Sequence, residues 1–232
     1  THSLRLMNQT SVLGRYLWVF RNIVGQMQHD LFHVYTVDQH ILFVIKNLRR
    51  FAYGNYPPDF SHAKHIFQQI DHPQILYLAA LFHDIAKGRQ GDHSTLGAQV
   101  ALDCCQHLAM SEEHRQRVAW LVEQDLLRSQ TAQRRDIADP ETIKTFCDIV
   151  GNQTRLDYLY LVTIADIAAT SSKLWNSWKD SLLWELYSIS SLALAEGTSN
   201  ILDRKQRIEE SMSEVRATLL REGVASDSID AL

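Results

Sequence analysis

Apolar residues along most of this chain follow the spacing of amphipathic helices, in which every third or fourth residue faces the same side. In residues 37–53, for example, Ile41, Val44, Ile45 and Leu48 form one apolar stripe. No alternating apolar and polar run is long enough to predict a strand. The same periodicity predicts further helices over approximately residues 12–26, 73–87, 96–109, 112–127, 140–150, 155–170, 177–196 and 204–221.

Residues that favour helix ends stand at the limits of several predicted helices. Thr36 begins a capping-box pattern before the first stripe, and Ser111 and Asp139 occupy N-cap positions. Pro73 stands near the first position of its helix, and Gly88 is placed as a C-terminal cap. Only 9 Gly and 4 Pro occur in 232 residues, so few residues interrupt the helices. The pattern and the composition together predict an all-α fold.

Four polar side chains interrupt the apolar faces of three predicted helices: His40, His83, Asp84 and Asp166. Asp is rarely buried without a partner, because an unpaired buried charge is unfavourable unless a pKa shift neutralises it. Each residue alone is also compatible with a hydrogen-bonded core position or a helix end. A single bound ion, however, accounts for all four. Two imidazoles and two carboxylates suit Mn, Fe, Zn, Co or Mg, and no thiolate is required.

Further groups with acid–base or phosphate-binding chemistry lie close to these residues or in the loops. Lys87 stands one turn after His83, where it suits either a phosphate oxygen or a solvated helix end. His93 lies in the following loop, next to Asp92. A polar, basic loop over residues 128–139 includes Arg134 and Arg135, which suit phosphate, an acidic protein partner or solvent alone. These residues are candidates for acid–base catalysis or phosphate binding next to the ion.

The overall charge and the cysteines limit the classes of function. The formal net charge of −4 gives no general attraction to nucleic acid or to an anionic membrane. No apolar run approaches the length of about 18 residues that suggests a membrane span, and the N-terminus has no signal-peptide pattern. The 3 Cys include no CxxC pair and predict a reducing, cytoplasmic location. Because the chain begins at Thr1 rather than at Met, we expect a piece of a longer protein or a processed one.

The spaced His, His–Asp and Asp residues resemble the HD superfamily of metal-dependent phosphohydrolases. The resemblance is closer to the HD domain of the bifunctional PII uridylyltransferase/uridylyl-removing enzyme family, and it extends over approximately residues 7–196. It is carried, in this order, by VGQMQHDLFHVYTVDQH, LFHDIAKGRQGDHSTLGA, SQTAQRRDIADPETI and TIADIAATSSKLWNSWKDSLLWELY. It implies an all-α HD-domain helical bundle with a metal site at its centre, formed by residues 1–200. Residues 201–232 would then be a C-terminal helix or linker toward absent ACT domains.

The resemblance implies metal-dependent phosphodiester hydrolysis that releases UMP from a tyrosine of the PII nitrogen-signalling protein. His40, His83, Asp84 and Asp166 match the metal ligands of the family, with Mg or Mn expected first and Fe, Zn or Co as alternatives. Uridylylated PII is then the substrate. A nucleotidyltransferase domain and glutamine-sensing ACT domains would be neighbours in the full-length chain, and no nucleic-acid or membrane partner is expected.

Hydrolysis of this kind gives expected catalytic and substrate-binding roles to further residues. Lys87 matches the Lys of the HDIAKG segment and is expected to offset charge on the phosphate. His93, with Asp92, is expected to position the water or to protonate the tyrosine oxygen as it leaves. Arg134 and Arg135 are expected to bind the substrate phosphate.

One departure from the family pattern concerns a second metal site. Where the family usually reads LV…HLLMS, this chain reads LVEQDLLRS, with Asp125 in place of His and Arg128 in place of Met. His93 matches a residue that binds a second ion in two-metal relatives, so His93 and Asp125 define an altered second site, at which Asp suits a hard ion. Two alternatives stay open. One is a regulatory, PII-docking domain with a vestigial or structural metal site, and the other is a phosphohydrolase of free nucleotides.

Overall fold

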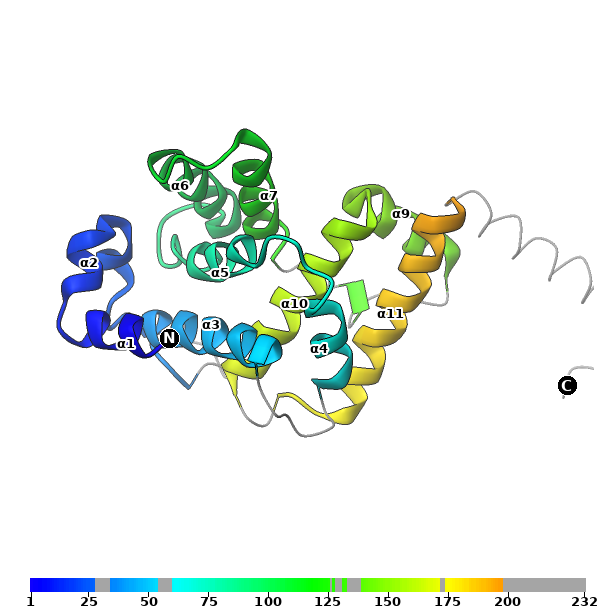
Figure 1. Cartoon of the computed structure of the whole chain (residues 1–232), viewed down its shortest axis with the longest axis horizontal. Helices are drawn as coiled ribbons and strands as arrows, with labels where there is room; N and C mark the ends of the chain where they lie inside the picture. Colours follow the sequence, from blue (N-terminus) through cyan, green and yellow to red (C-terminus); the bar gives the residue numbers. More distant parts are fainter. Residues whose placement is uncertain are drawn as a thin grey trace, which may run out of the picture.

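The computed structural model describes residues 1–27, 34–53, 60–125, 127, 131–132, 139–171 and 174–197. Within these ranges the regular elements are all helical, which confirms the predicted all-α fold (Figure 1). In chain order they are α1 (His2–Gln9), α2 (Val12–Tyr16), the 3₁₀ helix η1 (Trp18–Ile23), α3 (Val37–Tyr53), α4 (Ser61–Phe67), α5 (Pro73–Phe82), α6 (His93–His107), α7 (Glu112–Glu123), α9 (Pro140–Val150), α10 (Gln153–Thr170) and α11 (Ser177–Glu196).

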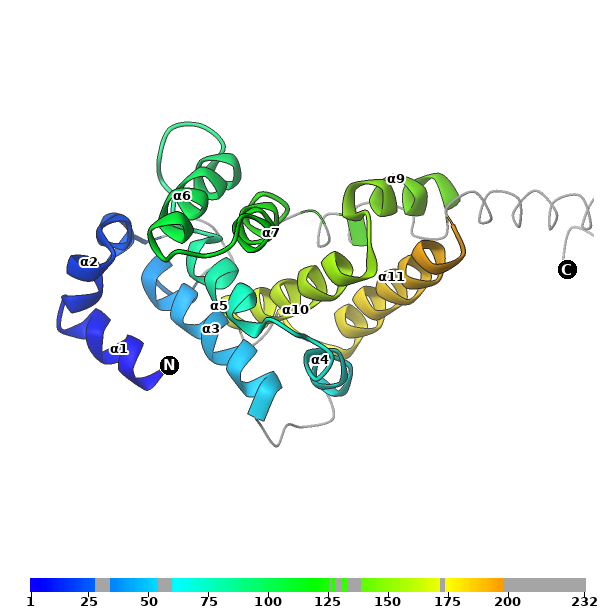
Figure 2. The ribbon, with the colours of Figure 1, turned by 45° about the horizontal axis from the view of Figure 1, so that its top comes forward.

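Helix α10 lies at the centre of the molecule, where it contacts α3, α4, α5, α7, α9 and α11. Most of its residues between Leu156 and Thr170 are buried, as expected for a helix that is apolar nearly all round. Helices α6 and α7 pair beside α5, whereas α9 pairs with α11 at the other end of the molecule (Figure 1, Figure 2). The central helix therefore joins the two ends and carries Asp166 between them.

Several predicted helix boundaries are confirmed. Helices α9 and α11 have the predicted limits, and α3 begins directly after Thr36. The Asp139 carboxylate accepts a hydrogen bond from the backbone N–H of Thr142 at 3.1 Å, and the Ser111 hydroxyl accepts one from the N–H of His114 at 3.4 Å. The predicted capping box is wrong in one respect, because the buried hydroxyl of Thr36 has no hydrogen-bond partner within the described residues.

The single helix predicted over residues 12–26 is wrong. The N-terminal segment instead forms three short elements, α1, α2 and η1. Ser11 has a φ of 59°, in the left-handed region, and separates α1 from α2. Leu17, with φ −112° and ψ 88°, leaves helical geometry between α2 and η1. The break at Leu17 thus divides the segment whose apolar spacing alone suggested continuity, and the break at Ser11 lies just before it.

The helix predicted over residues 73–87 ends earlier, at Phe82. Beyond it the backbone tightens, with hydrogen bonds from the N–H of Ile85 to the carbonyl of Phe82 (3.1 Å) and from Lys87 to Asp84 (3.0 Å). These bonds have the i to i+3 spacing of a 3₁₀ turn. Gly88 then adopts a φ of 80°, as its predicted position after a helix end requires.

Other predicted boundaries also shift. Helix α6 begins at His93 rather than residue 96, α7 ends at Glu123 rather than residue 127, and α4 was not predicted. Helix α4 has only seven residues, of which Ala63, Ile66 and Phe67 are buried, so its apolar pattern is short. The predicted helix over residues 204–221 and the proposed linker over residues 201–232 lie outside the described residues.

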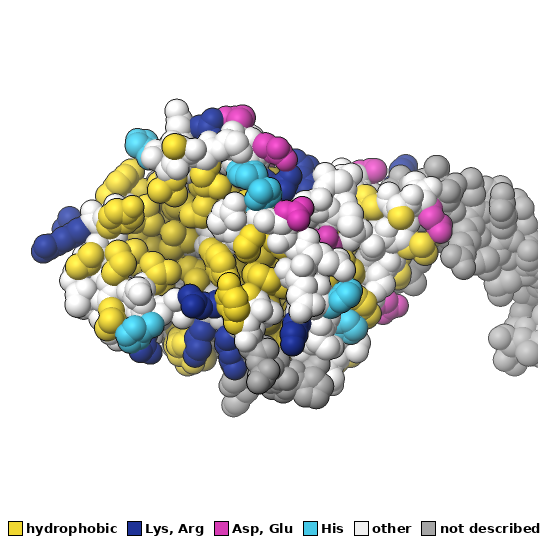
Figure 3. Space-filling model, viewed as in Figure 1, with side chains coloured by type: hydrophobic (Ala, Val, Ile, Leu, Met, Phe, Trp, Pro, Cys, Tyr) yellow, Lys and Arg dark blue, Asp and Glu magenta, His cyan; other side chains and the backbone are white. Residues whose placement is uncertain are grey.

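Several large apolar side chains are exposed in the N-terminal segment, among them Leu6, Val12, Tyr16 and Trp18. In Figure 3, which has the view of Figure 1, hydrophobic side chains gather over the N-terminal helices and their neighbours. Among the helices whose structure is described, none is both long and apolar enough to cross a membrane.

Candidate metal centre

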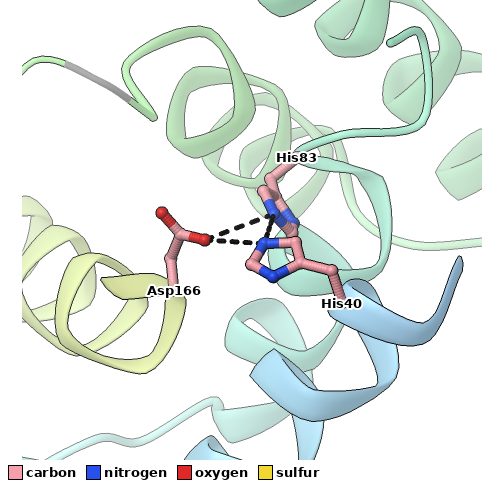
Figure 4. Close-up of side chains that lie close together, drawn as sticks. All are labelled: His40, His83 and Asp166. Carbon is pink, nitrogen blue, oxygen red and sulfur yellow. Dashed lines mark hydrogen bonds and ion pairs between the residues drawn. The ribbon is translucent and has the colours of Figure 1, made fainter. Parts of the chain in front are cut away.

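Three segments that are distant in sequence bring two imidazoles and a carboxylate together. His40 comes from α3, His83 from the residue after α5, and Asp166 from α10 (Figure 4). The Nε2 atom of His40 lies 2.8 Å from Oδ1 of Asp166 and 3.3 Å from Nε2 of His83. The His83 Nε2 atom is 3.8 Å from the same carboxylate oxygen. Ligand atoms of the three residues all lie within 4.8 Å of one another, a spacing that suits a shared metal ion.

Asp84 adds a second carboxylate to this group. Its Oδ2 atom lies 3.5 Å from Nε2 of His83 and 3.9 Å from Nε2 of His40. The same oxygen accepts a hydrogen bond from the ammonium of Lys87 at 3.0 Å. We refer to His40, His83, Asp84 and Asp166 as the HD cluster. The four side chains that the sequence assigned to one site thus lie together, while their role as ligands stays a prediction.

The local fold orients His83 for ligation. Its Nδ1 atom lies 2.8 Å from the carbonyl oxygen of Ala80, to which an Nδ1–H can donate. That tautomer leaves Nε2 without a proton and facing His40 and Asp166, as a metal ligand requires. Burial lowers the pKa of His83, which keeps the imidazole neutral. The observed hydrogen bond therefore favours the form of His83 that binds a cation.

The charges within the HD cluster set the protonation states of Asp84 and His40. Burial alone would raise the pKa of Asp84, but the hydrogen-bonded ammonium of Lys87 and the nearby imidazole of His40 hold it well below its usual value. Burial alone would lower the pKa of His40, yet the hydrogen bond and the charge of Asp166 raise it. Asp84 is accordingly a carboxylate at neutral pH, and His40 donates to Asp166 in the absence of a cation.

Asp125, just beyond the end of α7, is a further buried carboxyl group, and the charges of Asp84 and Asp166 act on it. The residue is 5% exposed, and its Oδ1 atom has no hydrogen-bond partner in the part of the chain that is described. Burial raises the pKa of Asp125 well above its usual value, and the charges of Asp166 and Asp84 raise it further. A buried carboxyl group that has an unsatisfied oxygen and feels the charges of two other carboxyl groups is a feature that a divalent cation would relieve. The residues present thus fit a metal ion.

Lys87 stands at the edge of the HD cluster. Its side chain is 25% exposed, whereas that of Asp84 is 3% exposed, so the ammonium lies between a buried carboxylate and solvent. An anionic substrate that approaches from solvent would meet this ammonium. The position is compatible with the role of Lys87, which stays a prediction.

Among the described residues, neither Asp92 nor His93 is joined to the HD cluster. The Asp92 carboxylate caps α6, where it accepts a hydrogen bond from the N–H of Ser94 at 2.9 Å. His93 is half-buried at the first position of α6, and no contact with the cluster is found among the described residues. Arg134 and Arg135, like Arg128, lie outside the described residues.

Sequence reasoning missed a side chain that ties two ligand-bearing helices together. The Nδ2 atom of Asn47 donates to the carbonyl oxygen of Ala165 at 3.1 Å, one residue before Asp166. This bond fixes α3 against α10 beside the HD cluster. The signal in the sequence was the spacing, since Asn47 lies seven residues after His40 and therefore on the same face of α3.

Residues 37–167 match the HD domain family. The chain belongs to the HD domain family. The match begins with α3 and ends just after Asp166, so this HD domain encloses all four residues of the HD cluster.

Curated relatives of this HD domain are longer proteins. The bifunctional uridylyltransferase/uridylyl-removing enzyme of Nitrosococcus oceani is 52% identical over 232 residues, which cover 100% of this chain and 26% of the relative. The enzyme of the same description from Burkholderia orbicola is 49% identical over 100% of this chain and 27% of its own length. That of Cupriavidus metallidurans is 56% identical over 190 residues, or 82% of this chain and 22% of the relative. The chain thus spans about a quarter of the length of the curated relatives it matches.

Proposed function

We propose that this HD domain is a metal-dependent phosphodiesterase that releases UMP from a uridylylated tyrosine of the PII signalling protein. The observation that carries the proposal is the convergence of His40, His83, Asp84 and Asp166 from three segments on one buried point. The substrate follows from relatives that are described as uridylyl-removing enzymes. UMP release from tyrosine is hydrolysis of a phosphodiester, which is within the chemistry of such a centre.

The HD cluster would hold a divalent ion, and we propose Mg or Mn ahead of Fe, Zn or Co. When bound, such an ion supplies Lewis-acid activation of water and of a phosphoryl oxygen. The chain's own contribution is orientation: Ala80 fixes the ring of His83, and Asn47 holds α3 against α10. His93 and Asp125 would form the altered second site, which stays a prediction.

Lys87 would neutralise charge on the phosphate during hydrolysis. Replacing Lys87 by Ala should lower the rate of UMP release by about 100-fold, since loss of a single group that stabilises transition-state charge typically has an effect of this size. Metal content should stay at the wild-type level, because Lys87 opposes rather than aids a cation beside Asp84. Steady-state rates and plasma-emission metal analysis measure the two quantities. Lys64→Ala, at an exposed position on α4, is the matched control.

Proton transfer and substrate binding complete the proposed site. His93, at the start of α6, would protonate the tyrosine oxygen as it leaves or position the attacking water. Asp92 already caps α6 through its carboxylate, so its proposed contribution is to the placement of His93. Arg134 and Arg135 would bind the substrate phosphate.

The setting of the reaction is also part of this proposal. Nucleotidyltransferase and ACT domains would accompany the HD domain in the longer protein, with residues 201–232 leading toward the ACT domains. The free thiols of Cys104, Cys105 and Cys147 are compatible with the cytoplasmic location expected from the sequence.

Uridylylated PII offered to the purified chain, with Mn²⁺ or Mg²⁺ and then after chelation, tests this function. We expect UMP release that depends on the metal, together with hydrolysis of the generic phosphodiester bis-p-nitrophenyl phosphate. A chain that binds PII but releases no UMP would contradict the proposal and indicate a regulatory, docking domain. Activity confined to free nucleotides would also contradict it and indicate a nucleotide phosphohydrolase.

A further inference from the structure

The turn that carries Lys87 depends on a hydrogen bond from a distant part of the chain. After α5 ends, the carbonyl groups of Asp84 and Ala86 accept from the N–H groups of Lys87 and Arg89 at 3.0 and 3.1 Å. The carbonyl of Lys87 accepts instead from the side-chain amide of Gln26, at 3.1 Å. A carbonyl at the end of a helical run is commonly satisfied from outside the run. Here the donor lies 61 residues earlier in the chain.

Gly88 makes room for this donor. Its φ of 80° lies in the left-handed region that glycine adopts readily. A methyl group added at Gly88 would overlap the amide nitrogen of Gln26. Glycine at this position therefore permits both the turn and the close approach of the amide, so the two residues are matched to each other.

Gln26 is itself fixed against the start of α3. Its backbone carbonyl accepts from the N–H of Val37 at 2.9 Å, and the N–H of the preceding Gly25 donates to the Asp38 carboxylate at 3.1 Å. Asp38 is buried and also accepts from the side-chain amide of Asn8 at 2.7 Å. The backbone of Gly25 and Gln26 is therefore bonded to Val37 and Asp38, the first two residues of α3. The side-chain amide of Gln26 extends toward Lys87 from this fixed backbone.

We propose that Gln26 is a positioning residue for Lys87, an inference that rests on the proposed function. The ammonium of Lys87 is held by Asp84 in the structure, but a cation at the HD cluster would share the charge of Asp84 and weaken that hold. The bond from Gln26 to the Lys87 backbone is independent of Asp84. It keeps the turn in place while the ammonium is released toward the phosphate.

Kinetics of Gln26→Met test the inference, since this change keeps a side chain of similar length and removes the donor. With Mn²⁺ and bis-p-nitrophenyl phosphate, we expect kcat to fall by about tenfold, the effect of roughly 1.4 kcal/mol on a barrier. KM and the affinity for Mn²⁺ should each stay within about twofold of wild type. In a Lys87→Ala background, Gln26→Met should have no further effect on kcat.

Two further measurements separate positioning from loss of structure. Amide hydrogen exchange should become faster at residues 87–89 in Gln26→Met, and Gln26→Glu, which also lacks the donating amide, should give the same fall in kcat. Gln99→Met, on the exposed side of α6, is the control and should match wild type. An unchanged kcat, or an equal loss in the Lys87→Ala background, would overturn the role of Gln26. A wild-type chain without activity would count against the proposed function instead.

Discussion

Replacing Asp166 by Asn should abolish metal binding and lower the rate of UMP release at least about 1,000-fold, while the chain stays folded. A metal ion supplies several kcal/mol of transition-state stabilisation, and three powers of ten correspond to about 4 kcal/mol. The substitution preserves the size of the side chain and an oxygen that can accept from His40, which lies 2.8 Å away. The carboxylate charge at this point of the HD cluster is what the change removes.

Thermal denaturation separates loss of metal from loss of fold in this variant. A ligand at about 100 times its Kd stabilises the native state by roughly 2.7 kcal/mol, which is about 5–10 °C in Tm for a chain of this size. Mn²⁺ should raise the Tm of the wild type by this amount and leave that of Asp166→Asn unchanged. Asp148→Asn, at an exposed position on α9, should respond like wild type. A metal-dependent rise of Tm in Asp166→Asn would contradict the assigned ligand.

Replacing Asp125 by Asn should stabilise the metal-free chain, with a rise in Tm on the order of 5 °C at pH 8. The carboxyl group is buried near Asp84 and Asp166, and its Oδ1 atom has no hydrogen-bond partner within the described ranges. Burial raises its pKa in the folded state above the value of 3.8 expected without these neighbours. Its contribution to stability is therefore fully present below about pH 4 and is lost as pH rises through the folded-state pKa. Asn at this position does not ionise, so the variant does not lose this stability as pH rises.

The pH dependence of Tm distinguishes this effect from a general gain in packing. Between pH 4 and pH 8, the difference in Tm between Asp125→Asn and wild type should grow from near zero to its full size in the metal-free protein. Adding Mn²⁺ should reduce the difference, because a cation compensates the charge of Asp125. Asp148→Asn should follow the wild-type curve throughout. Parallel curves for Asp125→Asn and wild type would show that Asp125 is not under electrostatic strain.

Helix positions were predictable where local signals agreed with packing. Asp139 and Pro140 mark the start of α9, and its apolar face continues to Val150 without a break. The N-terminal segment was not predictable in the same way, because Ser11 and Leu17 leave helical geometry without a glycine or proline at those positions. The early end of α5 was missed for a similar reason: the apolar pattern continues through Ile85 and Ala86, but the backbone tightens there.

Candidate ligands were predictable because a polar side chain on an apolar helix face is unfavourable unless it binds a partner. Periodicity shows which face His40 or Asp166 occupies, although it contains no information on the distance between helices. Asn47 and Gln26 were missed because they act on backbone carbonyl groups of Ala165 and Lys87, which no side-chain pattern reveals. The capping role of Asp92 was missed because the start of α6 was predicted three residues too late.

The requirement for a metal ion at the HD cluster is tested most directly by titrating Mn²⁺ into the chelator-treated chain. Bound metal, measured by plasma emission, and UMP release from uridylylated PII are read from the same samples. We expect no release from the metal-free chain, and a rate that rises in proportion to bound metal until the centre is filled. Full activity in the metal-free chain, or metal uptake at His40, His83, Asp84 and Asp166 without any UMP release, would contradict the proposed role of the site.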